Sequence, residues 1–100
     1  MNTIEKKKFG TNELFIKPKG RIDIASTPEL EREVNSEIEN ILYLTVDMSE
    51  VDYISSVGLR ALLSFQKQLS SKGEVKIVNI KPEVLEIFKM VGFDKVLNLE

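Results

Sequence analysis

The sequence predicts an α/β domain whose mixed sheet begins with a hairpin and continues with alternating helices and strands. Two strand-like segments stand near the N-terminus on either side of a short polar turn. Segments of helical periodicity then alternate with short apolar runs, which is typical of an α/β fold. The chain has 100 residues, enough for one domain and too few for two. We therefore expect a single domain over residues 1–100.

The predicted hairpin pairs residues 3–9 with residues 13–20, because Gly10, Thr11 and Asn12 form a polar turn of hairpin length. A first helix is expected next, with Ser26 or Thr27 as its N-cap and Pro28 in its first turn. Its apolar residues recur every three or four positions and should form one buried stripe, made of Leu30, Val34, Ile38 and Ile41.

The run from residue 41 to residue 46 is apolar except for Thr45, and it predicts a strand buried on both faces of the sheet. Residues 47–50 are expected to form a loop, and residues 51–54 a connection into the second helix. That helix should run from about Ser56 to Ser71 and end at Gly73. The remaining expected elements are a strand at 75–79, a helix between Pro82 and Gly92, and a short strand at 96–99.

Composition excludes several functions. The chain has no Cys and no His, so disulfides, thiol chemistry and His-based acid–base catalysis are absent. A metal site could use only carboxylate and carbonyl oxygens, which suit magnesium or calcium. The net charge of −2 argues against nucleic acid as the main partner, and Lys6, Lys7 and Lys8 fit a solvated strand better than a binding patch. We expect no cofactor and no resident metal.

No apolar stretch reaches the roughly 20 residues that a membrane-spanning helix requires, and the N-terminus has no apolar export signal. A cytoplasmic location is therefore expected.

Two serines, Ser55 and Ser56, stand where a polar loop meets the predicted second helix. The first N–H groups of a helix lack partners and its dipole is positive at this end, so a phosphate on a hydroxyl here meets a ready anion site. Arg60 lies four residues after Ser56, within reach of such a phosphate. Two serines before a helix are most often ordinary capping residues. Residue chemistry alone therefore favours capping over a phosphorylation switch.

The helical wheel divides the second helix into two faces. Leu59, Leu62, Leu63 and Leu69 should face the sheet, and Ser56, Arg60, Ser64 and Lys67 should be solvated. Val57 and Ala61 fall at the border. A strip of hydroxyl, small apolar and cationic residues suits protein docking.

Five segments resemble the STAS family, named for sulphate transporters and anti-sigma factor antagonists, in the same order and spacing. They are Gly20-Arg21-Ile22-Asp23, Asp47-Met48-Ser49, Ile54-Ser55-Ser56-Val57-Gly58-Leu59, Asn79 followed by Pro82, and Gly92-Phe93. The resemblance covers nearly the whole chain and implies a STAS-like single domain. A chain of this length resembles the stand-alone bacterial antagonists.

That resemblance implies a partner-switching cycle. The unphosphorylated domain would bind an anti-sigma factor with serine kinase activity, and so release a sigma factor. The kinase would phosphorylate a serine at the start of the second helix, and a metal-dependent serine phosphatase would reverse the step. The family pattern Asp-Ser-Ser-Gly-Leu, with the first serine as acceptor, places Ser55 at the acidic position and Ser56 at the acceptor. Ser55 is the alternative acceptor or a cap.

Residues near the acceptor form the predicted partner surface. They are Asp23, Ser55, Ser56, Val57, Gly58, Arg60, Ala61 and Ser64. Asp23 could instead bond its own loop backbone. Two readings compete with the antagonist: a STAS scaffold or ligand-sensing domain that is never phosphorylated, and a small enzyme using Asp47 and Asp52 as a carboxylate pair. The missing His and Cys make an enzyme the weakest, so we expect no catalytic residues.

Overall fold

A computed structural model describes residues 4–100 as a sheet with helices alternating along the chain. The strands are β1 (Ile4–Phe9), β2 (Glu13–Ile22), β3 (Tyr43–Asp47), β4 (Glu50–Ile54), β5 (Glu74–Val78) and β6 (Asn98–Leu99). The helices are α1 (Thr27–Asn35), α2 (Ser56–Leu69) and α3 (Pro82–Met90), with 3₁₀ turns η1 (Ile38–Asn40) and η2 (Phe93–Lys95). The predicted hairpin, helices and mixed sheet are confirmed within residues 4–100; Thr3, predicted in the first strand, lies outside them.

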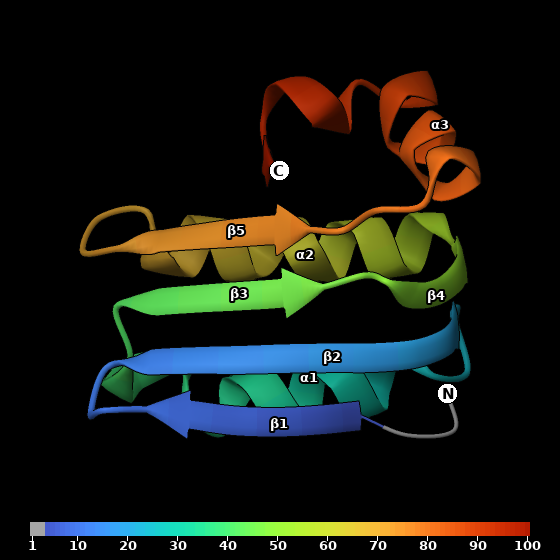
Figure 1. Ribbon diagram of the computed structural model, residues 1–100. Helices are drawn as coiled ribbons and strands as arrows, with labels where there is room; N and C mark the ends of the chain where they lie inside the picture. The colour runs from blue at the N-terminus through green and yellow to red at the C-terminus, as the bar shows by residue number, and fades with distance from the viewer. Residues whose placement is uncertain (1–3) are drawn as a thin grey trace.

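The sheet has the order β1-β2-β3-β5-β6, and β4 pairs with β2 off this path. Only β1 and β2 are antiparallel in the described part of the chain; the other pairs are parallel. Helices α1 and α2 lie on the same face of the sheet, and α3 lies beyond β5 at its edge (Figure 1). The α/β architecture follows from this layering, with most of the core between the sheet and α1 and α2. Helix α3 adds Val84 and Phe88, which are fully buried, to the same core.

Strand β3 was predicted to be buried on both faces, and this was wrong. Leu44 and Val46 are fully buried toward the helices, but Tyr43 is 46% exposed and Thr45 is half-buried on the other face. The reason is the position of α1 and α2, which cover a single face of the sheet (Figure 1). The strand therefore alternates as a half-covered strand does.

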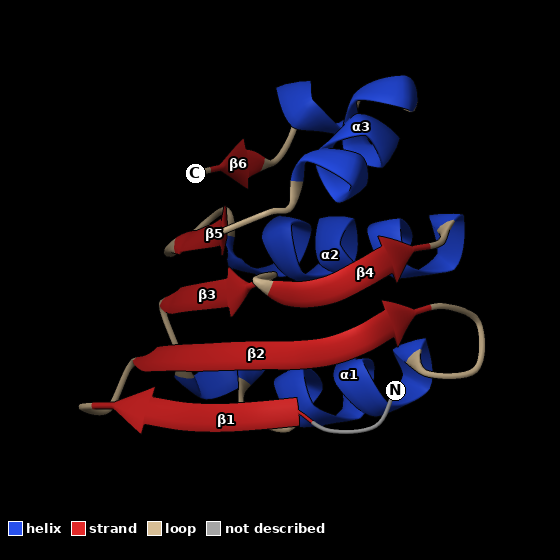
Figure 2. Ribbon diagram, turned by 45° about the vertical axis from the view of Figure 1, so that its right-hand side comes forward, coloured by secondary structure: helices blue, strands red, loops and turns tan. Residues whose placement is uncertain are grey.

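Residues 51–54 were predicted as a connection, but they belong to strand β4. The chain turns after Met48, whose carbonyl accepts the Val51 N–H at 3.0 Å, and the backbone is extended again in β4. Strand β2 has ten residues, long enough to pair first with β3 and then with β4. Figure 2 shows β4 beside the second half of β2. This pairing brings the end of β4, and so the start of α2, next to Ile22.

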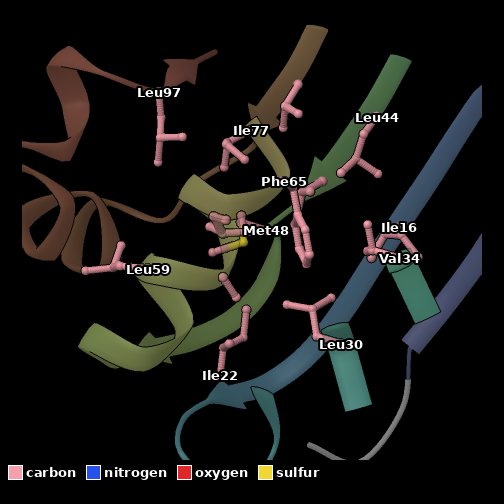
Figure 3. Close-up of a cluster of buried hydrophobic side chains, with 14 of the residues drawn as sticks. Ile16, Ile22, Leu30, Val34, Leu44, Met48, Leu59, Phe65, Ile77 and Leu97 are labelled. Atoms are coloured by element: carbon pink, nitrogen blue, oxygen red, sulfur yellow. The ribbon is translucent and has the colours of Figure 1, made fainter. Parts of the chain in front are cut away.

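One cluster of buried side chains fills the space between sheet and helices (Figure 3). Phe65 of α2, Met48 and Ile16 are each at most 1% exposed. Burying a side chain of this size contributes about 1.5–3 kcal/mol. The four residues of the predicted stripe, Leu30, Val34, Ile38 and Ile41, are all buried. The prediction that one helix carries them was wrong, because α1 ends at Asn35 and Ile38 lies in η1, with Ile41 extended after it.

Helix ends follow the predicted signals. Gly92 adopts φ 78°, a left-handed conformation that glycine accepts at little cost, and its N–H donates to the Lys89 carbonyl at 3.1 Å. The N–H of Gly73 donates to the carbonyl of Leu69 at 2.7 Å and ends α2 two residues earlier than predicted.

Candidate functional site

The two adjacent serines at the start of α2 have different structural roles. Ser55 is the N-cap, with extended backbone (φ −87°, ψ 172°), and its Oγ accepts the Gly58 N–H at 3.3 Å. Its own N–H donates to the Ile22 carbonyl at 2.8 Å. Ser56 is the first helical residue and is exposed; the hydrogen bonds found in residues 4–100 include none to its hydroxyl. Ser55 is thus engaged in holding the helix, and Ser56 presents an accessible hydroxyl.

The solvated face of α2 carries the predicted cations. Arg60 and Lys67 are exposed, and together with Ser64 and Gln68 they line a shallow hollow. Leu63, which was predicted to face the sheet, is only half-buried and lines the same hollow. Arg60 lies one turn after Ser56 on this face. A negative group on Ser56 would therefore meet both the helix N-terminus and a guanidinium.

Two residues predicted to line the partner surface are buried instead. Gly58 is buried, and a Cβ built there would lie 2.7 Å from Cγ2 of Ile22 and 2.8 Å from Cγ1 of Ile54. Ala61 is 3% exposed. Both are covered where α2 packs on the strands, so neither presents a side chain at the surface. The glycine allows the first turn of α2 to approach the ends of β2 and β4 closely.

The turn after β2 is held by a ring of hydrogen bonds between Asp23 and Ser26. The Asp23 N–H donates to Ser26 Oγ at 2.9 Å, and Ser26 Oγ donates to the Arg21 carbonyl at 2.7 Å. Asp23 Oδ1 accepts the N–H groups of Ala25 and Ser26, each at 3.1 Å. The Asp23 carboxylate therefore bonds its own loop backbone, one of the two roles considered for it.

These bonds also set the charge of the turn. The Ser26 backbone N–H is the main cause that holds the pKa of Asp23 below its usual value, and it outweighs the opposite effect of desolvation. The other carboxylate oxygen lies 3.5 Å from Arg21 Nε. The Arg21 guanidinium in turn stacks 4.3 Å from the centroid of the half-buried Tyr53 ring. The Tyr53 ring thus supports this cation at the surface.

One exposed residue of the turn was missed from the sequence. Ile24 is 76% exposed between Asp23 and Ala25. A branched aliphatic residue in a turn otherwise built from polar and small residues was the available signal. Of the predicted surface residues, Ser56, Arg60 and Ser64 are exposed and Asp23, Ser55 and Val57 are half-buried.

Asp47 and Asp52, considered as a catalytic pair, have different partners. Asp47 Oδ1 accepts the Ser49 N–H at 2.9 Å, which closes the turn between β3 and β4. Partial burial would raise the pKa of Asp47, but the hydrogen bonds from Ser49 and Asn79 outweigh it and leave the pKa lowered. Asp52 pairs with Lys81 Nζ at 2.6 Å, and this bond raises the pKa of Lys81. Each carboxylate has a structural partner.

The sequence of residues 3–100 matches the model of the STAS domain family. The chain belongs to the STAS family. A Bordetella bronchiseptica protein named as an anti-sigma factor antagonist, BtrV, is 36% identical over 76 residues, which cover 74% of this chain and 66% of that protein. The chain thus spans just under two thirds of this relative's length.

Solved structures of STAS proteins share the fold. An anti-sigma factor antagonist from Mycobacterium paratuberculosis superposes with a TM-score of 0.86 at 23% identity, covering 97% of this chain and 83% of that one. The antagonist SpoIIAA in its unphosphorylated form gives 0.84 at 14% identity, covering 98% and 88%. The Bacillus SpoIIAA structure in the phosphorylated form gives 0.76 at 13% identity, covering 98% and 91%. At these identities the structures establish the fold alone. Within residues 4–100, no helix is both long and apolar enough to span a membrane.

Proposed function

We propose that this STAS domain is a non-catalytic anti-sigma factor antagonist that is switched by phosphorylation of Ser56. In its unmodified form it binds an anti-sigma factor with serine kinase activity, so that a sigma factor is released in the cytoplasm. A metal-dependent serine phosphatase restores the unmodified form. The relationship to BtrV and the shared fold with SpoIIAA, for which a phosphorylated form is known, support this assignment.

The observation that carries the proposal is the division of roles between Ser55 and Ser56. A phosphate on Ser55 would disturb the oxygen that caps the Gly58 N–H. A phosphate on Ser56 would leave that bond in place and add about 1.5–2 negative charges at an exposed helix start. The geometry therefore favours Ser56 as acceptor over Ser55.

The same geometry suggests how the switch would act. The phosphate would be stabilised by the N-terminus of α2 and by Arg60. It would also place charge and bulk on the surface offered to the partner, and like charge or unpaired charge at an interface opposes association. Binding would thus be lost without unfolding of the domain.

The test uses the anti-sigma factors with serine kinase domains encoded in the same genome, purified individually and incubated with this protein and ATP. Intact mass should increase by one phosphate, and peptide mapping should place it on Ser56. Ser56→Ala should abolish the increase, whereas Ser55→Ala and the matched control Ser71→Ala, an exposed serine just after the end of α2, should retain it. No added phosphate on Ser55 or Ser56 would overturn the switch and favour a STAS scaffold or ligand-sensing domain that is never phosphorylated.

A further inference from the structure

The turn that carries Ile24 is rigid for its size. Besides the four bonds of the Asp23–Ser26 ring, the backbone N–H groups of Ser26 and Thr27 donate to the Asp23 carbonyl at 3.2 and 2.8 Å. Ser26 is 2% exposed, so the two bonds made by its hydroxyl lie largely away from water. The backbone that carries Ile24 is thus fixed before any partner arrives, which lowers the entropy that binding must remove.

Ile24 contributes little hydrophobic stabilisation to the folded domain, because its side chain is not buried. Its side chain is 76% exposed, whereas its neighbours in sequence Ile22 and Leu30 are fully buried. The turn is held by Asp23 and Ser26 and needs no apolar residue at position 24. An exposed branched aliphatic side chain on a fixed backbone has the properties of an interface anchor that fills an apolar pocket on a partner.

The end of β2, which leads into the turn, lies beside the start of α2. The Ser55 N–H donates to the carbonyl of Ile22, two residues before Ile24, and Gly58 packs against the Ile22 side chain. Two polypeptide segments far apart in the sequence are thus fixed side by side, one bearing Ile24 and the other bearing Ser56.

We propose that Ile24 is the apolar anchor of the surface that docks the anti-sigma factor, and that the anti-sigma factor holds an apolar pocket beside its serine kinase active site. This inference rests on the proposed function, because Ile24 is assigned to the anti-sigma factor on the ground that it lies on the same surface as Ser56. The pocket accepts one branched aliphatic side chain. The Asp23 carboxylate and the Arg21 guanidinium flank Ile24 and would lie at the rim of this interface. Polar contacts at an interface rim fix the orientation of the partner more than they add affinity.

The test measures binding of the same purified anti-sigma factors to variants of the full chain by calorimetry. Ile24→Ala should weaken binding about five- to tenfold and Ile24→Asp at least about tenfold, as for a buried interface anchor. Ile24→Val should stay within about twofold. The matched control is Met90→Asp, since Met90 is 82% exposed but lies at the end of α3, and it should change the Kd by less than about twofold.

Phosphorylation kinetics give a second readout. If Ile24 docks the kinase, Ile24→Asp raises the KM for this protein as substrate and leaves kcat unchanged, because the residue is not part of the reacting group. Thermal unfolding of each Ile24 variant should match the wild type, which separates docking from folding.

The outcomes distinguish the inference from the function on which it rests. Loss of binding in Ser56→Asp with full binding in Ile24→Asp would overturn the Ile24 anchor and leave the switch intact. A wild-type chain that binds none of the anti-sigma factors would overturn the proposed function and the anchor together. A wild-type dimer that Ile24→Asp converts to a monomer, measured by light scattering, would assign Ile24 to a second copy of the chain and also overturn the anchor.

Discussion

Gly58 lies so close to Ile22 that a Cβ at position 58 would stand 2.7 Å from the Ile22 Cγ2 atom. Gly58→Ala should therefore destabilise the domain. Overpacking of this kind costs about 1–3 kcal/mol, and the better helix propensity of alanine offsets about 1 kcal/mol of that. A net loss of up to about 2 kcal/mol is therefore expected in urea unfolding. Ser64→Ala, on the exposed face of the same helix, serves as control and should be neutral or slightly stabilising; equal stability of the two variants would contradict the close packing.

The two serines at the start of α2 should respond differently to substitution. Ser55→Ala removes the side-chain cap of Gly58 and should cost about 1 kcal/mol. Ser56→Ala should change the free energy of unfolding by less than about 0.5 kcal/mol, because the residue is exposed. Denaturant unfolding of both variants, with Ser55→Asp as a substitution that retains an N-cap oxygen, checks the assignment. A larger loss for Ser56 than for Ser55 would reverse the roles.

Ser56→Asp should imitate the charge of a phosphate without harming the fold. A carboxylate in the first turn of a helix interacts favourably with the helix dipole, so thermal stability should be unchanged or slightly raised. Affinity for the anti-sigma factor should fall, as measured by calorimetry beside the neutral variant Ser56→Asn. A marked drop in the melting temperature of Ser56→Asp would mean that Ser56 has a structural role.

Thr27 offers a test of the buried start of α1. It is 1% exposed, and its Oγ1 has no hydrogen-bond partner among the described residues. Thr27→Val keeps the branched shape and removes the buried hydroxyl, so it should stabilise the protein by about 1 kcal/mol. Thr27→Ser, which keeps the hydroxyl and removes a methyl group, should destabilise it. The midpoints of urea unfolding should move in opposite directions for the two variants. A shift in the same direction would contradict a destabilising buried hydroxyl at Thr27.

The hydrogen bonds to Asp23 predict a dependence of stability on pH. The pKa of Asp23 is lowered in the folded protein, so its contribution is present above the unfolded pKa of about 3.9 and is lost as pH falls through the folded value. Stability should therefore fall more steeply below about pH 4 in the wild type than in Asp23→Asn. NMR titration of the Asp23 carboxyl carbon measures the pKa directly, and a value at or above 3.9 would contradict the prediction.

Sequence patterns predicted most elements because their signals are local. Pro28 and Pro82 mark two helix starts, and Gly92 marks a helix end, each through the backbone conformation of the residue itself. Strand β4 was missed because its partner is β2, more than 25 residues away, and the step at Met48 breaks the pattern between β3 and β4. The covered and open faces of β3 depend on where α1 and α2 pack, which no local pattern specifies.

The candidate site was predicted in part for the same reason. The wheel of α2 correctly placed Ser56, Arg60, Ser64 and Lys67 in solvent. It could not show that Ala61, at the border of the two faces, is covered, since this depends on how closely the helix approaches the sheet. The roles of Ser55 and Ser56 required the cap geometry, and Ile24 required the exposed fraction of a single side chain.

The close contact of Gly58 with Ile22 and Ile54 has a consequence for how mutations in this protein are interpreted. These interior side chains set the spacing between the Ile24 turn and the first turn of α2. They therefore determine how far apart Ile24 and Ser56 lie on the surface. A substitution at Ile22 or Ile54 that keeps the domain folded but shifts α2 would change that spacing. Screens for defective partner recognition should therefore recover interior positions that no partner touches.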